Sequence, residues 1–526
     1  MPEIDINDLG SVGVIQDQPG YQLPPEAWTT MNNCRVTGGG VEKLPGWTPT
    51  LGTNPRTSSD TPLFTMYVSG PTQAWWLWAS NAHMYVFDGV NDTDITRAVG
   101  GNYNAADAFA LNGTIFQGIP IINTGSDKPQ FWATYSAGQK MQDLTNWPAT
   151  LLCRVIRSFK AYLVALNLTT GGVAQPHNLR WSTAAVPGSL PATWDFTDPT
   201  QDAGVTSLPD VASGQIMDGM ELGGQFYIYK ENAVWRMQFI GGRFIFGFFT
   251  FLENAGLLST RCVDTTGDGL WHVFASQDDI IRHNGVTAES LLSKRLRRYL
   301  FNQIDPAHYN TSFMFGNPVY DEMWFCYPTV GALEPNRALI WNYKYNVFTE
   351  ADIDFRHASI GTVQTAGVTW AQQTLNWNQD TADWANSKRR RIVLSNPTTK
   401  KLLLLDDGTA RDGVAFNGLL QRLGLSIIGR KRNGEWIEDF QHRKMVQMLW
   451  PKFQTNSGQP VNVRVGYQQT VNGGVAWNGY QTFDPNTQIF VQGCEGDGRS
   501  VAVEFNSNNF FRADGYKLDI VKQGMY

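Results

Sequence analysis

The sequence is poor in charged residues. Asp, Glu, Lys and Arg make up 17% of the 526 residues, against roughly 25% in an average globular domain. There are 41 Lys and Arg against 47 Asp and Glu, which gives a net charge of −6. Dedicated nucleic-acid binders are normally basic, so this class is not supported. The aromatic content of 13% excludes a disordered chain.

Cysteine and long apolar runs are also scarce. The five cysteines form no C-x-x-C pair and lie far apart, at Cys34, Cys153, Cys262, Cys326 and Cys494. We therefore expect neither a zinc ribbon nor a disulfide framework. We expect the cysteines to be buried free thiols in a reducing cytoplasm. The most apolar stretch, residues 244–252, is about half as long as a membrane helix. The acidic start, residues 1–5, lacks the features of a signal peptide. We expect no membrane-spanning segment.

Catalytic patterns are missing. The sequence has no phosphate-binding loop, no G-x-G-x-x-G after a strand, no G-x-S-x-G and no H-E-x-x-H. The seven histidines lack metal-ligand spacing on any shared element. Residues 264–269 faintly resemble a calcium loop, but Ala275 stands where an acidic ligand is needed. We therefore predict no catalytic site, no metal and no cofactor, and a protein that is not an enzyme.

Short alternating strands separated by turn residues dominate the chain. Residues 77–87 end at Asp88-Gly89, and residues 271–281 are followed by Asn284-Gly285. Such units begin roughly 40 to 65 residues apart, near the period of about 40 to 50 residues that propeller blades have. An array of sandwiches would alternate similarly, but the repeated strand-turn rhythm favours a β-propeller. The number of blades stays open.

The predicted fold class is mainly β, a β-propeller-like core with an additional C-terminal antiparallel β-sandwich domain. Residues 1–60 would form an extended N-terminal docking segment and the first strands. Residues 61–415 would form the propeller and residues 416–526 the C-terminal β domain.

Two insertions interrupt the propeller rhythm. Residues 289–304 place Leu292, Leu296 and Leu300 on one face of a predicted helix, with Ser290 as its N-cap. Residues 365–398 form an excursion rich in Trp and Arg. Within it Trp370, Trp377 and Trp384 are spaced by seven, which fits either a helix or stacked indoles.

Three basic clusters stand out in this charge-poor chain. They are predicted either to contact phosphate or acidic neighbouring subunits, or to be a solvated helix face and loops. Their residues are Lys294, Arg295, Arg297 and Arg298; Lys388, Arg389, Arg390 and Arg391; and Arg430, Lys431 and Arg432.

The N-terminal stretch is the most motif-like part. It contains Leu23-Pro24-Pro25-Glu26-Ala27-Trp28, followed by Asn32-Asn33-Cys34-Arg35 and the turn of residues 38–47. With residues 13–17, the tryptophan series and the ending from Lys444 to Gly524, it resembles the tail tubular (nozzle) proteins of short-tailed bacteriophages. The resemblance touches most of the chain, although only a few dozen positions are motif-like.

This resemblance implies a structural virion protein that forms the tail nozzle ring, a homohexameric conduit for genome ejection. Implied partners are adaptor and portal-side tail proteins, tail fibres or spikes, and double-stranded DNA in passage. Assembly would take place in the bacterial host cytoplasm. The net negative charge of such a ring would tend to repel phosphates, which lets DNA slide through it. The alternatives are a portal-proximal head-to-tail connector or plug, and a receptor-polysaccharide-binding propeller that uses Trp370, Trp377 and Trp384.

Overall fold

The computed structural model describes most of the chain. The described ranges are residues 3–50, 60–70, 74–89, 91–105, 111–242, 244–293, 295–363, 390–431, 435–456, 458–470, 473–492 and 495–525. Within them the fold is mainly β, and the one α-helix is α1 (Arg297–Gln303). The described ranges also contain the short 3-10 turns η1 (Gly20–Gln22), η3 (Val211–Ser213) and η4 (Tyr309–Thr311). No helix of the described ranges is long and apolar enough to span a membrane.

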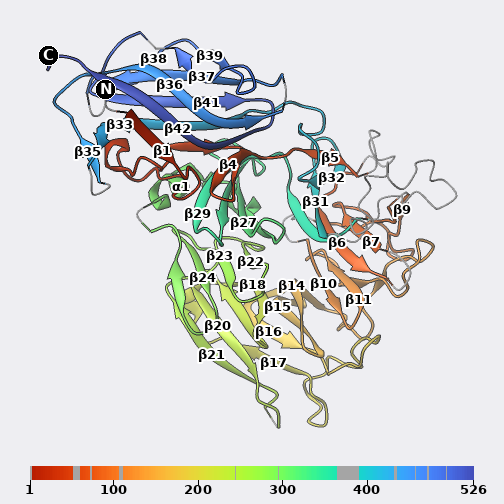
Figure 1. Ribbon diagram of the computed structural model, residues 1–526. Coiled ribbons are helices and arrows are strands. Elements are labelled where there is room, and N and C mark those ends of the chain that lie inside the picture. Colours follow the sequence, from red (N-terminus) through yellow and green to blue (C-terminus); the bar gives the residue numbers. More distant parts are fainter. Residues whose placement is uncertain are drawn as a thin grey trace.

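Seven successive four-stranded antiparallel units form the blades of a β-propeller within these ranges (Figure 1). Blade 1 consists of β6 (Phe64–Ser69), β7 (Ala74–Ala79), β8 (Met84–Phe87) and β9 (Asp92–Asp94). Blade 2 consists of β10 (Asn112–Phe116), β11 (Ile119–Asn123), β12 (Gln130–Phe131) and β13 (Gln142–Asp143). Blade 3 consists of β14 (Leu151–Phe159), β15 (Tyr162–Thr170), β16 (Val173–Trp181) and β17 (Gly204–Ser207).

The remaining blades follow in chain order. Blade 4 consists of β18 (Ile216–Leu222), β19 (Gln225–Lys230), β20 (Ala233–Phe239) and β21 (Phe246–Glu253). Blade 5 consists of β22 (Val263–Thr265), β23 (His272–Ala275), β24 (Ile280–His283) and β25 (Ala288–Ser290). Blade 6 consists of β26 (Phe313–Asn317), β27 (Glu322–Tyr327), β28 (Arg337–Asn342) and β29 (Val347–Asp352). Blade 7 consists of β30 (His357–Thr362), β31 (Arg390–Asn396), β32 (Lys401–Leu405) and β5 (Trp47–Pro49).

The blades close into a ring. The first strand of each blade contacts the first strand of the next, and β30 contacts β6 to complete the circle. The outer strand of blade 7, β5, comes from the N-terminal segment and pairs with β32, Trp47 opposite Leu405 and Pro49 opposite Leu403. Joining the two ends of the propeller within one blade couples ring closure to the N-terminal segment. The structure therefore has a β-propeller core.

The C-terminal part is a β-sandwich that also uses N-terminal strands. One sheet contains β1 (Glu3–Asn7), β3 (Cys34–Thr37), β4 (Gly40–Lys43), β36 (Lys444–Thr455), β40 (Val491–Gln492) and β42 (Phe511–Lys522). The facing strands are β2 (Thr30–Asn32), β33 (Gly418–Leu425), β37 (Val461–Gln468), β38 (Ala476–Trp477), β39 (Gln481–Phe483) and β41 (Ser500–Ser507). Aromatic rings of Trp28, Phe453, Phe505 and Tyr516 pack between the sheets.

The sandwich and the propeller share a sheet. Strand β2 pairs with β29 of blade 6 in parallel, Asn32 opposite Glu350, and with β33 of the sandwich in the antiparallel sense. Blade 6 thereby continues into a ten-stranded sheet. Figure 1 shows the sandwich, with the red N-terminal strands among its blue ones, beside blades 6 and 7 and away from the tips of blades 3 and 4.

The helix is shorter than the sequence indicates. Ser290, predicted as its N-cap, lies instead in β25, where it pairs with Ile281 of β24. The first residues of the predicted helix thus form the outer strand of blade 5. The helix begins at Arg297, and a distant carboxylate caps it: Asp17 accepts hydrogen bonds from the backbone N–H groups of Arg298 and Tyr299, both at 2.9 Å.

The predicted insertion of residues 365–398 also ends earlier than the sequence indicates. Residues 390–396 fall within the predicted range 365–398 but form strand β31 of blade 7. Alternation cannot reveal this strand, because buried residues follow one another from Ile392 to Asn396. Trp370, Trp377 and Trp384 lie outside the described residues.

Candidate functional site

A buried ion cluster joins the N-terminal segment to the propeller. The guanidinium of Arg35 donates two hydrogen bonds to the carboxylate of Glu322, from Nε at 3.0 Å and from Nη2 at 2.9 Å. Its Nη1 donates to Oδ1 of Asp406, also at 2.9 Å. Burial lowers the pKa of Arg35, but Asp406 and Glu322 raise it above its ordinary value. Because this one cation binds carboxylates of two blades, the cluster is a structural joint between β3, blade 6 and blade 7.

A second buried arginine holds the Leu-Pro-Pro stretch. Arg422 on β33 donates from Nη1 to the carbonyl of Gly20 at 2.8 Å, and from Nη2 to that of Leu23 at 3.0 Å. Gly20 lies so close to the backbone of Leu423 that an added Cβ at Gly20 would come 2.7 Å from the carbonyl oxygen of Leu423. These contacts fix η1 on the sandwich, so the motif-like N-terminal residues hold parts of the fold together.

The first basic cluster is largely satisfied within the chain. Arg295 donates from Nη1 to the carbonyl of Asn346 at 3.0 Å, and Arg297 forms an ion pair with Asp278. The guanidinium of Arg298 is exposed and makes no hydrogen bond or ion pair with another described residue. Lys294 lies outside the described ranges. Among the described residues of this cluster, Arg298 is therefore the uncommitted cation.

The second basic cluster lines a cavity in the seam between blades 6 and 7. Arg390 and Arg391 share a space of about 320 Å³ with Asn317, Tyr320 and Asp406. Among the described residues neither arginine has an ion-pair partner, and the oxygens of Asp406 already accept from Arg35 and Asn317. Lys388 and Arg389 are not described. Positive charge is thus available to a ligand or neighbouring subunit here.

The third basic cluster lies on a hairpin of the sandwich, formed by β34 (Ile427–Arg430) and β35 (Trp436–Glu438). The guanidinium of Arg430 stacks 4.8 Å from the ring centre of Trp436. Lys431 pairs with Glu435 at 3.0 Å on the exposed surface. Arg432 lies outside the described residues. The three clusters lie on separate elements, near α1, β31 and β35 (Figure 1).

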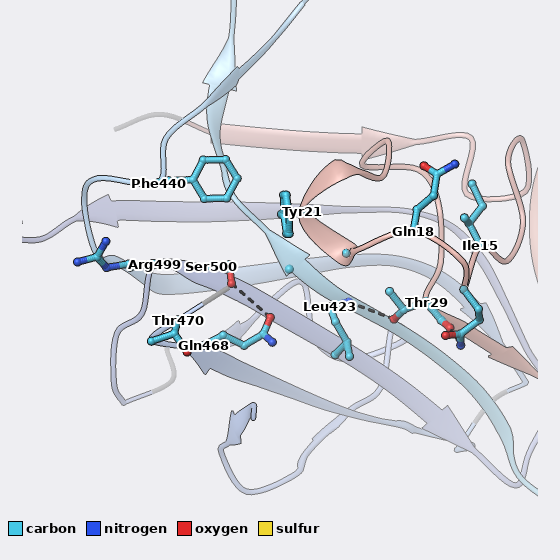
Figure 2. A pocket seen from close by; sticks show the side chains of 13 residues that line it. Ile15, Gln18, Tyr21, Thr29, Leu423, Phe440, Gln468, Thr470, Arg499 and Ser500 are labelled. Atoms are coloured by element: carbon cyan, nitrogen blue, oxygen red, sulfur yellow. Dashed lines mark hydrogen bonds between the residues drawn. The ribbon is translucent and has the colours of Figure 1, made fainter. Parts of the chain in front are cut away.

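A polar cavity lies between η1 and the sandwich (Figure 2). Its volume is about 230 Å³, and a bulge of β33 between Arg422 and Leu425 forms part of its wall. Tyr21 and Phe440 meet edge to face, with ring centres 5.7 Å apart. Opposite them Figure 2 shows Gln468, Thr470 and Ser500, with the Ser500 hydroxyl donating to Gln468 at 3.3 Å. Sequence reasoning missed this cavity, because its walls come from segments about 400 residues apart.

A group of exposed apolar side chains lies on β17 and β21, the outer strands of blades 3 and 4, and on the segments that lead into them. We call it the apolar edge, and its residues, each 36% to 72% exposed, are Phe196, Val205, Phe239, Ile240, Phe244 and Phe249. Phe196, Val205 and Phe244 border one groove of about 490 Å³. Strand β21 is the last strand of its blade and leaves a sheet edge without a partner strand among the described residues. Exposed apolar side chains that gather around one groove are typical of interaction sites.

Two buried histidines share one tyrosine hydroxyl between blades 4 and 5. The Tyr229 hydroxyl lies 2.8 Å from His272 Nδ1 and 2.7 Å from His283 Nε2. Burial lowers the pKa of His272 to about 4. Burial, together with His272, lowers that of His283 to about 3. Both imidazoles are therefore neutral at pH 7 and belong to the packing between blades.

No group of three His, Cys, Asp or Glu side chains within the described ranges is arranged to hold a metal ion. The candidate calcium loop forms a turn instead. The carboxylate of Asp264 accepts from the backbone of Thr265 and of Gly316, both at 2.8 Å. Asp268 accepts from Leu270 N–H at 3.0 Å. These hydrogen bonds to backbone N–H groups are typical of a structural turn.

Comparison with known proteins finds propeller structures. No family model and no curated protein matches the chain. PorZ of Porphyromonas gingivalis matches at 11% identity and a TM-score of 0.37, covering 82% of this chain and 46% of PorZ. The β-propeller domain of Myceliophteria thermophila Cps50 (Swd1) matches at 10% identity and TM-score 0.34, covering 60% of this chain and 96% of that domain. Kluyveromyces lactis Hsv2 matches at 9% identity and a TM-score of 0.31, covering 54% of this chain and 82% of Hsv2. This chain spans about half of PorZ, and none of the three is a phage tail protein.

Proposed function

We propose that this chain is a structural virion protein, a subunit of the tail nozzle ring of a short-tailed bacteriophage. The apolar edge carries the proposal. Six large apolar side chains are exposed on two adjacent blades, in a protein whose charge content is only 17%. Interface cores are depleted in charge and enriched in aromatic residues, so the edge suits a permanent contact with another subunit.

The resemblance to tail nozzle proteins supports two further parts of the proposal, the ring and its position in the virion. It implies a homohexamer below the portal and adaptor through which DNA leaves the virion. A ring needs a heterologous contact, in which the apolar edge of one copy meets a different surface of the next. Arg390 and Arg391 lie in a separate seam and supply positive charge either to that neighbour or to passing DNA.

Assembly of the purified chain tests the proposal. Phe244→Ser together with Phe249→Ser removes two exposed rings and leaves the buried core in place, so the variant should fold and remain monomeric where the wild type forms rings. The control is Val99→Ser, an exposed apolar residue in the loop between blades 1 and 2. Wild-type and variant rings of equal abundance would refute the assigned interface. The same variant should produce virions without a complete tail. A portal-proximal connector or plug would also form rings, and labelling in virions separates it from a nozzle.

A receptor-polysaccharide-binding protein is the second candidate. The cavity in Figure 2 favours it, because Tyr21 and Phe440 offer aromatic surface beside the amide of Gln468 and the hydroxyls of Thr470 and Ser500. A volume of about 230 Å³ suits one sugar unit. Glycan-array binding by the wild type that is lost in Phe440→Ala would support this candidate, and an array without signal would remove it.

A further inference from the structure

A loop beside the apolar edge carries only negative charge. It spans residues 195–202, between β16 and β17 of blade 3, and we call it the acidic loop. Its charged side chains are Asp195, Asp198 and Asp202. Asp195 and Asp202 are exposed, and Asp202 also lines the groove that Phe244 borders. The loop therefore places carboxylates beside the surface proposed to meet another subunit.

No ion pair with a described residue neutralises the acidic loop. The carboxylates of Asp195 and Asp198 accept hydrogen bonds from backbone N–H groups of their own loop, both at 2.9 Å. Arg180, the cation that precedes the loop in the sequence, donates from Nε to the carbonyl of Trp194 at 3.0 Å. The sequence holds no Lys or Arg from there to Lys230. The carboxylates of the loop thus remain available to a cationic partner outside the chain.

Positive charge of the matching kind lies in the seam between blades 6 and 7. Arg390 and Arg391 line the cavity of about 320 Å³ there and have no ion-pair partner in the described part of the chain. The carboxylate of Asp406 in the same cavity is already bound by Arg35 at 2.9 Å. Val319, 59% exposed, adds apolar surface to the cavity wall. Complementary charges on two surfaces favour their association and fix its register.

The acidic loop and this seam lie far apart on one face of the propeller. The loop follows the third strand of blade 3, and Arg390 begins the second strand of blade 7. In an antiparallel blade the third strand ends, and the second strand begins, at the same face. The groove between blades 3 and 4 is three blades of seven from the seam, which is about half a turn. Figure 1 accordingly shows β17 and β21 away from β31. A ring needs two different surfaces directed at two neighbours, and this placement supplies them.

We infer that the acidic loop of one copy docks against Arg390 and Arg391 of the next copy. The inference rests on the proposed ring and names the charged groups on the two sides of its contact. The planar fork of a guanidinium matches the two oxygens of a carboxylate. The apolar edge lies beside the loop, so the charged pairs form at the border of the apolar contact and set which surface of the neighbour it meets.

Reversal of charge in two variants tests the contact. Variant A carries Asp195→Arg and Asp202→Arg, and variant B carries Arg390→Glu and Arg391→Glu. Either variant alone brings like charges together at every contact, so its ring formation should weaken at least tenfold. An equal mixture restores opposite charges at every contact of a ring in which the two variants alternate. Native mass spectrometry of the mixture should therefore show rings with equal numbers of both variants.

Asp484→Arg is the control for variant A. Asp484 accepts a backbone hydrogen bond within a turn of the sandwich, as Asp195 does within its loop, and this variant should form rings as the wild type does. Rings from variant A or variant B alone, or no rings from their mixture, would overturn the inference and leave the ring itself in place. A wild type that forms no rings would refute the proposed function and this contact together.

The salt dependence of ring formation covers the case in which a reversed variant fails to fold. Wild-type rings should dissociate at least tenfold more readily at high salt than at low salt, because salt screens exposed charges. Asp195→Asn with Asp202→Asn removes the two charges without placing new ones, and its rings should lose most of this dependence. A salt dependence equal to that of the wild type would contradict the contact.

Discussion

Arg35 and Glu322 form a fully buried, two-fold hydrogen-bonded ion pair across 287 residues of sequence. Arg35 lies on a sandwich strand and Glu322 on blade 6, so the pair fixes the two parts of the molecule to each other. Asp406 of blade 7 completes the cluster.

Arg35→Met should destabilise the protein strongly. It leaves the Glu322 carboxylate buried without its cation, and breaking a buried ion pair typically costs about 3 to 5 kcal/mol. Denaturant unfolding measures the loss. Arg297→Gln, which breaks an exposed pair, should cost less than about 1 kcal/mol. Equal effects of the two substitutions would show that the cluster does not join the parts.

Gly46→Ala should weaken ring closure at blade 7. An added Cβ would lie 1.9 Å from the carbonyl oxygen of Ala410, so the start of β5 and the segment that follows β32 must move apart. The expected cost is about 1 to 3 kcal/mol, with faster amide exchange at Trp47 and Thr48. Gly474→Ala is the control, because an added Cβ there meets no atom within 4 Å. Unchanged exchange in β5 would contradict the closure role.

Stability should fall in mild acid because of the buried histidines. In the unfolded chain they take up protons below about pH 6.5, whereas in the fold His272 does so only near 4 and His283 near 3. Their contribution is complete above pH 6.5 and is lost as the pH falls towards 3. Each histidine adds up to about 1.4 kcal/mol per pH unit to the slope of the unfolding free energy against pH.

Substitution of one histidine checks this assignment. His283→Gln should flatten the dependence of unfolding free energy on pH between 6.5 and 4. Ile281→Val on the same strand, which removes one methylene and no titrating group, should lower stability without altering the slope. An unchanged slope in His283→Gln would assign the acid sensitivity to other groups.

Arg390→Ala with Arg391→Ala should leave folding intact, because both side chains lack ion-pair partners among the described residues. If they bridge subunits or guide DNA, virion assembly or genome release should drop at least tenfold. Arg430→Ala, a stacked arginine of the third cluster, is the control. Normal assembly and infectivity of the double variant would remove this role.

The propeller core could be predicted from the sequence because alternation and turn residues are local signals. The seven blades could not be counted, since β5 of blade 7 lies some 350 residues before β32. Ser290 was assigned to a helix because its pairing with Ile281 is invisible in a helical pattern. The basic clusters were visible, but only the fold shows that Arg297 has a partner while Arg390 and Arg391 have none in the described part of the chain.

The rotational symmetry of the protein in electron micrographs tests the central proposal most directly. Purified particles, and tails labelled with an antibody to this chain, should show rings of six copies at the distal end of the tail. A monodisperse monomer that is absent from virions would contradict it.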